Sequence, residues 1–252
     1  GSSLDFQDHR AYMPGDDPRH INWQAYARTG HYSMKLYREE VRPVVDLVVD
    51  VSASMFLDPL KARRTCELLY FLHESGARSG SALRFHLVAG DRFRPLQAES
   101  IPSHRWFEEA RSLQDEEAPG HPDLNPVPLR PNAIRILLSD LLFEGDPTAV
   151  IRHLSHGHGS PIVLVPFSPS ESDPDWHGNY EFVDAERGSR HPHRIEPGTL
   201  KRYKEAYANH FALWKSVARR FHSTLARIDS STDLESALHA EAVPSGALDV
   251  AN

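Results

Sequence analysis

The chain has 252 residues, a formal charge of -7 at pH 7, 40% hydrophobic residues and 25% charged residues. This length and composition accommodate one large α/β domain or two small ones, and they exclude a chain that is disordered throughout. The negative charge argues against a general nucleic-acid-binding protein, because that class needs a positive surface to displace counterions from phosphates.

Cysteine usage and hydropathy bear on the compartment. Cys66 is the single cysteine, so an internal disulfide is excluded and a reducing, cytoplasmic location is expected. It lies in an apolar helical pattern, which predicts a buried thiol. No apolar run approaches the roughly 20 residues that span a bilayer, and no signal pattern opens the chain. We therefore expect no membrane span in this chain, while an upstream anchor stays open.

Strand and helix patterns follow one another along the chain from residue 44 onward. Five prolines between residues 118 and 132 interrupt this order and predict an extended loop. Asp146 is the expected cap of one helix, and Ser231 or Thr232 of the last helix. Strands are predicted over 44–51, 82–90, 133–140, 161–167 and 224–228, and helices over 59–80, 104–114, 146–157, 200–221 and 231–240.

This alternation predicts an α/β fold, with a mainly parallel sheet flanked by helices on both faces. The domain is assigned to residues 44–240, with an irregular insertion or small hairpin over 168–198. Residues 1–43 are expected to pack on this domain, and residues 241–252 to form a flexible tail. Ligands of such folds bind at the carboxyl ends of the strands, which is where site residues are sought.

Oxygen-bearing residues stand at the carboxyl end of the first central strand. Asp50, Ser52 and Ser54 alternate there, so their oxygens can turn toward one point of the following loop. Asp140 ends another central strand and supplies a second carboxylate across the same crevice. Oxygen ligands of this kind suit a hard cation such as Mg2+. The alternative is structural, with the two serines only capping the helix that follows.

These four residues resemble the metal-ion-dependent adhesion site of the von Willebrand factor A-type domain. The resemblance implies a von Willebrand A-like, Rossmann-type fold and a Mg2+ or Mn2+ ion held by the four side chains. It also implies that an acidic group of a protein partner completes the metal shell. The family's threonine ligand has no counterpart here, because Pro122 stands in its place. Asp123 or Asn125 is the expected substitute as an oxygen ligand.

A second resemblance lies in the segment before this strand. The run from Arg10 to Trp23 is similar to the motif R-x-Y-x-x-G-D-D-x-R-x-I-D-W of the bacterial family called domain of unknown function 58. Asn22 stands where that family usually has Asp. The similarity is dense over about residues 5–56 and looser up to about residue 240.

The same segment can be interpreted from its residues alone. Asp17 is expected to cap a short helix that starts directly after it. Trp23 and Tyr26 are expected to anchor the segment to the domain. Asp16 and Arg19 then pair with each other or with a partner. The candidate partner-binding residues are Asp16, Asp17, Arg19 and Trp23.

Together the resemblances imply a non-enzymatic protein–protein interaction module. They imply a partnership with MoxR-type AAA+ ATPases, in chaperone-like assembly or activation of other complexes. No nucleic-acid partner is expected. The segment before the strand would extend the recognition surface and contribute no chemistry of its own.

Two alternatives stay open. One is a metal-dependent hydrolase that uses Asp50, Asp140 and the loop histidines of 156–159 and 191–193. The other is a scaffold whose site is degenerate. The chain has neither a glycine-rich phosphate-binding motif nor a G-x-S-x-G elbow, so nucleotide binding and serine hydrolysis have no support.

Overall fold

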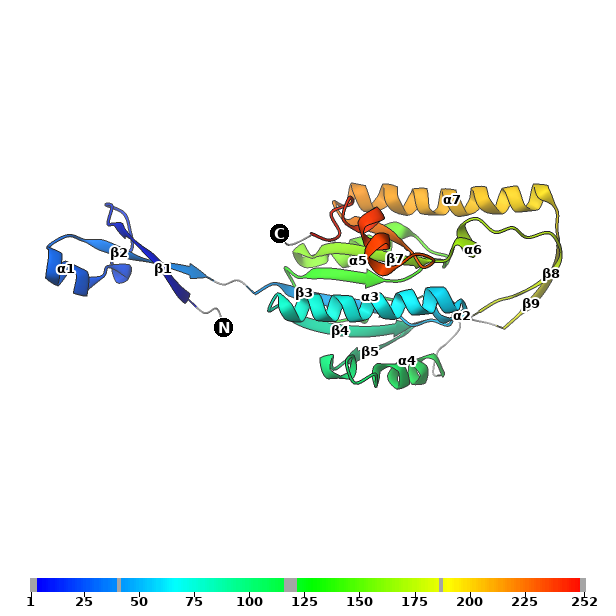
Figure 1. The fold of residues 1–252 in the computed structure, drawn as a ribbon, viewed down its shortest axis with the longest axis horizontal. Coiled ribbons are helices and arrows are strands. Elements are labelled where there is room, and N and C mark those ends of the chain that lie inside the picture. Colours follow the sequence, from blue (N-terminus) through cyan, green and yellow to red (C-terminus); the bar gives the residue numbers. More distant parts are fainter. Residues whose placement is uncertain (1–3, 40–41, 116–121, 186–187, 250–252) are drawn as a thin grey trace. The chain divides into compact units, whose positions relative to one another are not determined.

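The computed structural model describes residues 4–39, 42–115, 122–185 and 188–249. The chain forms two compact units, Gly1–Arg42 and Pro43–Asn252, and each is described by itself (Figure 1). The division falls next to the predicted boundary at residue 43. Packing of the first segment on the domain stays a prediction.

The first unit is built on an antiparallel pair of strands with two short helices between them in sequence. Asp17 caps the first helix as predicted, because its carboxylate accepts a hydrogen bond from Arg19 N at 3.0 Å. Asn22 caps the second, because its side chain accepts from Ala25 N at 3.1 Å. The residue that departs from the family motif therefore keeps a capping role. The elements are β1 (Leu4–Ala11), η1 (Pro18–His20), α1 (Trp23–Thr29) and β2 (Ser33–Glu39).

The second unit is centred on a six-stranded sheet. All neighbouring strands are parallel except the last pair, β4 and β5. The chain adds β4 and β5 on one side of β3, and β6, β7 and β10 on the other, which is the doubly wound topology. The predicted fold class is thereby confirmed. In spatial order the strands are β10 (Thr224–Asp229), β7 (Ser160–Phe167), β6 (Ile134–Leu138), β3 (Val44–Asp50), β4 (Ala82–Ala89) and β5 (Arg92–Leu96).

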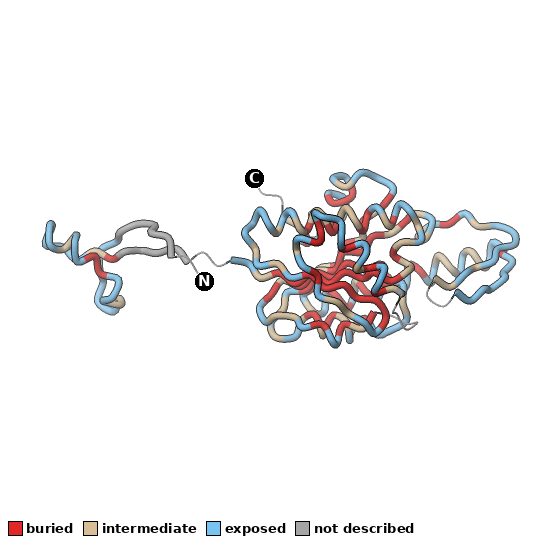
Figure 2. Tube along the Cα trace, turned by 90° about the horizontal axis from the view of Figure 1, so that it is seen from below, coloured by how far each residue is buried: buried red, intermediate tan, exposed pale blue. Residues whose placement is uncertain are grey.

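Helices cover both faces of this sheet. Leu69 of α3 and Trp106 of α4 pack in the core of one face, and Ile151 of α5 and Trp214 of α7 in the core of the other. The buried residues of this unit gather on the strands between these layers (Figure 2). The helices are α2 (Ser54–Leu57), α3 (Pro59–Arg78), η2 (Ala98–Ser100), α4 (Trp106–Asp115), α5 (Pro147–Ser155), η3 (His156–His158), α6 (Pro169–Ser172), α7 (Pro197–Arg220), α8 (Leu234–Ala237) and η4 (Leu238–Ala242). Within the described ranges, none of the helices has the length and apolar character that a membrane span requires.

Several elements differ from the prediction. Strand β5 was not predicted, and it pairs antiparallel with β4 at the edge of the sheet. The segment 168–198 contains the small hairpin that was one of its two predicted forms, made of β8 (Gly178–Val183) and β9 (Arg190–Ile195), and it also contains α6, which was not predicted. Figure 1 shows this hairpin at the same end of the unit as α2 and α6.

The last helix also differs in detail. Asp233 caps α8, because its side chain accepts from Ser236 N at 2.9 Å, so the predicted cap at Ser231 or Thr232 was wrong. Part of the segment predicted as a tail is packed, since Ala242 and Ala247 belong to the core of one face of the sheet.

The proline-rich loop follows the prediction over its described part. Residues 122–132 contain neither helix nor strand. Arg130 fastens the loop to the sheet: its backbone N–H donates to Asp46 Oδ2 at 2.6 Å and its Nε to Asp46 Oδ1 at 2.7 Å. At the other end of the loop, Asp123 N donates to the carbonyl of Gly90, just beyond β4.

Candidate functional site

The predicted site residues lie at the topological switch point of the sheet, between β3 and β6. From there the chain adds β4 and β5 on one side of β3 and the later strands on the other. Asp50 is the last residue of β3, and Ser139 and Asp140 follow the last residue of the neighbouring β6. Ligands of doubly wound folds bind in the crevice at this point. The order of the strands thus brings together residues that stand about ninety positions apart in the sequence.

Asp50 is the centre of a hydrogen-bonded network. Its Oδ1 accepts from Ser52 N at 3.0 Å and from Ser52 Oγ at 2.6 Å. Its Oδ2 accepts from Ser139 Oγ at 2.7 Å. Ser54 Oγ lies 3.2 Å from Ser52 Oγ. Asp50, Ser52 and Ser54, three of the predicted ligands, are therefore in one network, and Ser139 joins them although the sequence did not single it out.

The pKa of the Asp50 carboxyl lies close to neutral pH. Burial raises its pKa to about 7, and the nearby Asp140 carboxylate adds to the rise, although hydrogen bonds from Ser52 and Ser139 oppose it. Asp50 is only 1% exposed, and the three hydrogen bonds just described come from neutral groups. These neutral donors bring no positive charge to Asp50, so a bound proton or a cation would have to neutralise the carboxylate.

Asp140 lies beside this network and has a partner of its own. Its Oδ2 accepts from Lys61 Nζ at 2.9 Å, and its Oδ1 accepts from Leu142 N at 3.0 Å. Lys61 Nζ also donates to Glu171 Oε1 at 2.5 Å. The side chains of Lys61 and Asp140 are 2% and 3% exposed. A buried lysine and a third carboxylate therefore belong to the site, and neither was predicted.

Local sequence places Lys61 in the site. Asp58 caps α3 by accepting from Leu60 N at 2.7 Å and from Lys61 N at 3.1 Å, which fixes the first turn of the helix. Glu171 is positioned by the capping box of α6, in which its side chain accepts from Ser168 N. The capping-box spacing of Ser168 and Glu171 was a visible signal for α6. Nothing in the sequence indicated that Lys61 and Glu171 meet.

Asp123 is not part of the Asp50 network. Its carboxylate accepts from Asn125 N at 2.9 Å and from Asn125 Nδ2 at 2.7 Å, so these two residues form a local turn. Among the described residues, neither side chain forms a hydrogen bond with Asp50, Ser52 or Ser54. Substitution of the missing threonine by Asp123 or Asn125 is therefore not seen, and it stays a prediction.

The donor set fits a small hard divalent cation. Neighbouring oxygens in an octahedral Mg2+ shell lie about 3.0 Å apart, as follows from metal–oxygen distances of about 2.1 Å. The spacings of 2.6 Å between Ser52 Oγ and Asp50 Oδ1 and 3.2 Å between Ser52 Oγ and Ser54 Oγ bracket that value. The described residues contain no group of three or more His, Cys, Asp and Glu side chains placed to hold a metal ion. A cation here would thus depend on the serine hydroxyls.

The predicted partner-binding residues lie in the first unit, and their pairing differs from the prediction. Asp16 pairs with Arg10 in a two-pronged ion pair of 2.8 and 2.7 Å, and Arg19 pairs with Asp17 at 2.6 Å. The expected pair between Asp16 and Arg19 was therefore wrong, and the alternative, pairing with a partner, stays a prediction. Hydrogen bonding to Arg19 lowers the pKa of Asp17 to about 2. Trp23 is 58% exposed and meets Tyr26 and Tyr32 edge to face.

The histidines of the hydrolase alternative are spread over the second unit. His156 and His158 belong to η3, just before the first residue of β7. They therefore lie at the amino ends of the parallel strands, whereas Asp50 lies at the carboxyl ends. His191 and His193 are in β9, where they pair across the hairpin with Phe182 and Tyr180. The first pair therefore lies away from the Asp50 network.

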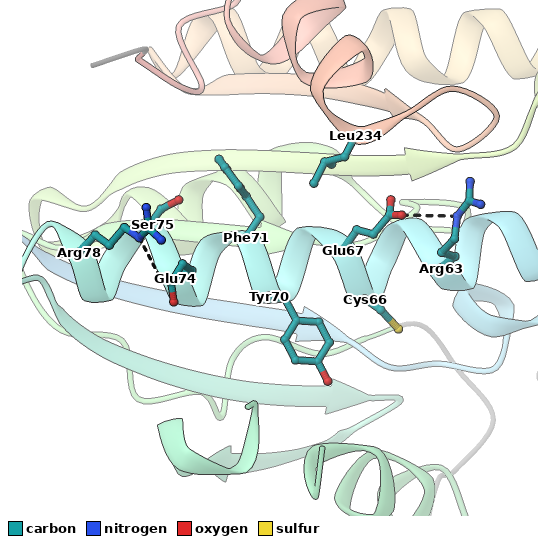
Figure 3. Close-up of a pocket in the computed structure, with 9 residues that line it drawn as sticks. All are labelled: Arg63, Cys66, Glu67, Tyr70, Phe71, Glu74, Ser75, Arg78 and Leu234. Carbon is teal, nitrogen blue, oxygen red and sulfur yellow. Dashed lines mark hydrogen bonds and ion pairs between the residues drawn. The ribbon is translucent and has the colours of Figure 1, made fainter. Parts of the chain in front are cut away.

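A separate hollow lies along the outer face of α3 (Figure 3). It has a volume of about 630 Å³. Its charged side chains pair with each other, Arg63 with Glu67 at 3.5 Å and Arg78 with Glu74 at 2.7 Å. Cys66 lines it half-buried, and burial raises the pKa of its thiol to about 11, so the sulfur is a neutral thiol at pH 7. This hollow therefore lacks an activated nucleophile.

The topology and the oxygen-rich loop at its switch point define a doubly wound α/β protein with a mainly parallel sheet. The chain belongs to the family described as Protein of unknown function DUF58, whose model matches residues 8–212. The second predicted resemblance is thereby confirmed.

Three similar solved structures illustrate what the chain resembles. An aerotolerance-related membrane protein from Bacteroides fragilis is 14% identical, with a TM-score of 0.35, over 71% of this chain and 98% of that chain. Conserved hypothetical protein BatB from Bacteroides thetaiotaomicron is 14% identical, with a TM-score of 0.41, over 82% and 100%. The pilus adhesin SpaC from Lactobacillus rhamnosus GG is 10% identical, with a TM-score of 0.29, over 76% and 25%. No curated protein matches the chain significantly.

Proposed function

We propose that the chain is a non-enzymatic, cytoplasmic protein-binding module. In this proposal, the site at the carboxyl ends of β3 and β6 holds Mg2+ or Mn2+ through Asp50, Ser52 and Ser54, with Asp140 beside them. The bound ion then recognises an acidic group of a protein partner. The partner class that the family resemblance implies is a MoxR-type AAA+ ATPase, which the module assists in assembling or activating other complexes.

The Asp50 network is the observation that supports this proposal. It places a buried carboxylate and three serine hydroxyls at the switch point of the sheet, with oxygen spacings suited to a hard cation. A divalent cation held there would neutralise Asp50 and attract a carboxylate from outside. Recognition of an acidic partner group follows from that charge.

The test is a binding measurement with purified proteins. The chain and the MoxR-type ATPase of the same organism are mixed, and the complex is followed by sedimentation velocity in millimolar Mg2+. We expect Asp50→Ala to abolish the complex. The matched control is Glu74→Ala, which removes a negative charge from the exposed ion pair with Arg78 on α3.

Asp50→Ala is the decisive variant, because a chelator would also strip the metal that the ATPase itself needs. A complex that survives Asp50→Ala unchanged would contradict the proposal and favour the scaffold alternative. Trp23→Ala tests the exposed aromatic group of the first unit in the same assay, and we expect it to weaken the complex.

A metal-dependent hydrolase is the second candidate, and one observation favours it. A carboxyl with a pKa of about 7 can act as a general acid or base at neutral pH. Against this, Asp50 is almost completely covered and is held by serine hydroxyls. Turnover of phosphate, ester or peptide substrates with Mg2+, Mn2+ or Zn2+ that is lost in Asp50→Ala would overturn the binding-module proposal.

A further inference from the structure

Lys61 is a buried cation that touches the candidate metal site. Its ammonium group donates to Asp140 Oδ2 at 2.9 Å and to Glu171 Oε1 at 2.5 Å, and the side chain is 2% exposed. Burial lowers the pKa of Lys61, and the two carboxylates raise it by more, so that the net shift is upward. Lys61 is therefore a permanent positive charge inside the site.

Asp140 connects this charge to the Asp50 network. It accepts the Lys61 ammonium group on one oxygen, and it directly follows Ser139, whose hydroxyl donates to Asp50 Oδ2 at 2.7 Å. A divalent cation held beside Asp50 would share Asp140 with the ammonium group. Two cations on one carboxylate repel each other strongly where water is excluded. Metal binding and the Lys61–Asp140 ion pair are therefore in competition.

Glu171 is the second carboxylate that Lys61 contacts. Its side chain is 20% exposed, and its Oε2 accepts from Ser168 N at 3.1 Å within the capping box of α6. Tyr203 of α7 donates to the backbone carbonyl of Glu171 at 2.8 Å, which fixes α6 against the longer helix. The ammonium group thus has a fixed carboxylate to pair with when Asp140 is engaged elsewhere.

We infer that Lys61 is an internal competitor of the divalent cation, bridging Asp140 and Glu171 in the metal-free site and keeping only its Glu171 partner when metal takes Asp140. This inference rests on the metal site of the proposed function and concerns how that site is regulated. It explains how two buried carboxylates are tolerated side by side without a metal ion. Glu171 belongs to α6, so the competition makes the affinity for the cation depend on the position of α6. The chain continues from α6 to the β8–β9 hairpin.

The test uses a charge-neutral double variant, Lys61→Met with Glu171→Gln, in the complete chain. The double variant removes one positive and one negative charge and keeps similar side-chain volumes, so a simple change in net charge predicts no effect. Mn2+ binding is measured by calorimetry and by the electron paramagnetic resonance signal of free Mn2+. Circular dichroism checks that each variant is folded.

Competition predicts that the double variant binds Mn2+ about tenfold more tightly than the wild type, because Asp140 is released from the ammonium group. Adding Asp50→Ala to it must remove this binding. Equal affinity in the double variant and the wild type overturns the inference, as does an absence of binding in both. Binding that persists with Asp50→Ala also overturns it, because the ion is then held elsewhere.

Single variants keep the inference falsifiable if the double variant does not fold. Glu171→Gln removes one ion pair of Lys61, so that Asp140 is its remaining carboxylate partner. Lys61→Met removes the ion pair between Lys61 and Asp140. Glu171→Gln is therefore expected to weaken Mn2+ binding about threefold, and Lys61→Met to strengthen it. An effect of the same sign in both variants, or none, overturns the inference. The inference concerns metal affinity and the proposed function concerns partner capture, so a failure of either is recognised separately.

Discussion

Ser139 Oγ donates a hydrogen bond to Asp50 Oδ2 at 2.7 Å, and this contact joins the end of β6 to the end of β3. Both residues are almost completely covered. The two strands therefore deliver a hydroxyl and a carboxyl to one point at the switch in strand order. Hydrogen bonds stabilise the ionised form of the Asp50 carboxyl, whereas burial and the Asp140 carboxylate destabilise it. The pH dependence of folding reports the balance between these effects.

The pH dependence of stability should depend on Asp50. Its pKa is about 7 in the folded chain against an ordinary value of 3.8, so the folded state binds more protons between these values. The resulting stability is present below about pH 4 and is lost as the pH rises through about 7. Asp50→Asn is therefore expected to raise the free energy of unfolding at pH 8 by about 2–4 kcal/mol without metal. Urea denaturation at pH 5 and pH 8 measures this, and an equal effect at both pH values would contradict it.

The Asp46–Arg130 ion pair should stabilise the fold strongly. Asp46 is completely buried and receives two hydrogen bonds from Arg130, whose guanidinium also donates to the carbonyls of Val45 and Ala82. Arg130→Met removes the guanidinium and leaves the Asp46 carboxylate without its charged partner, with the backbone N–H of residue 130 still donating to it, and we expect a loss of about 3 kcal/mol in the free energy of unfolding.

The exposed pair Arg190–Glu181 is the control for this prediction, at 2.8 Å but on the surface of the hairpin. Arg190→Met should change the free energy of unfolding by less than about 0.5 kcal/mol. Chemical denaturation of both variants compares them directly. Similar losses in the two would show that burial of the pair is not what matters.

His86 should make the fold sensitive to acid. It is 2% exposed, and neither ring nitrogen has a hydrogen-bond partner within the described part of the chain. Burial lowers its pKa below the ordinary value of 6.5. A lowered histidine pKa means that the folded state binds fewer protons, so stability is present above about pH 6.5 and falls as the pH drops below it.

His86→Leu should therefore reduce this loss and raise the free energy of unfolding at pH 5 by about 1 kcal/mol or more. The same substitution at the exposed His177 is the control. Thermal denaturation between pH 5 and pH 8 is the measurement. A His86→Leu variant with the pH profile of the wild type would refute the assignment.

Asn22 should stabilise α1 through its side-chain oxygen. Asn22→Ala removes the hydrogen bond to Ala25 N, at an expected cost of about 1 kcal/mol to the helix. Asn22→Asp restores the residue that is usual in the family and keeps the acceptor, so it should preserve α1. Hydrogen exchange over Trp23–Thr29 reports the difference. Faster exchange in both variants, or in neither, would contradict the capping role.

Local pattern was enough to predict most of the fold. The β-branched run of β3 and the helical spacing in α3 and α7 specify their elements independently of distant residues. Strand β5 escaped prediction because Arg-Phe-Arg-Pro-Leu is short and polar and contains Pro95, which a strand tolerates only at an edge. Its place at the edge is a property of the whole sheet.

The candidate site divides in the same way. The grouping of Asp50, Ser52 and Ser54 after a buried strand could be predicted from local spacing, because they are close neighbours in the chain. The parts played by Ser139 and Lys61 could not be predicted in this way: Ser139 completes the network from another strand, and Lys61 lies between Asp140 and Glu171, which are 79 and 110 positions away from it. The physical reason is that strand order brings distant loops to one edge of the sheet, where burial makes each charge depend on partners that no local pattern reveals.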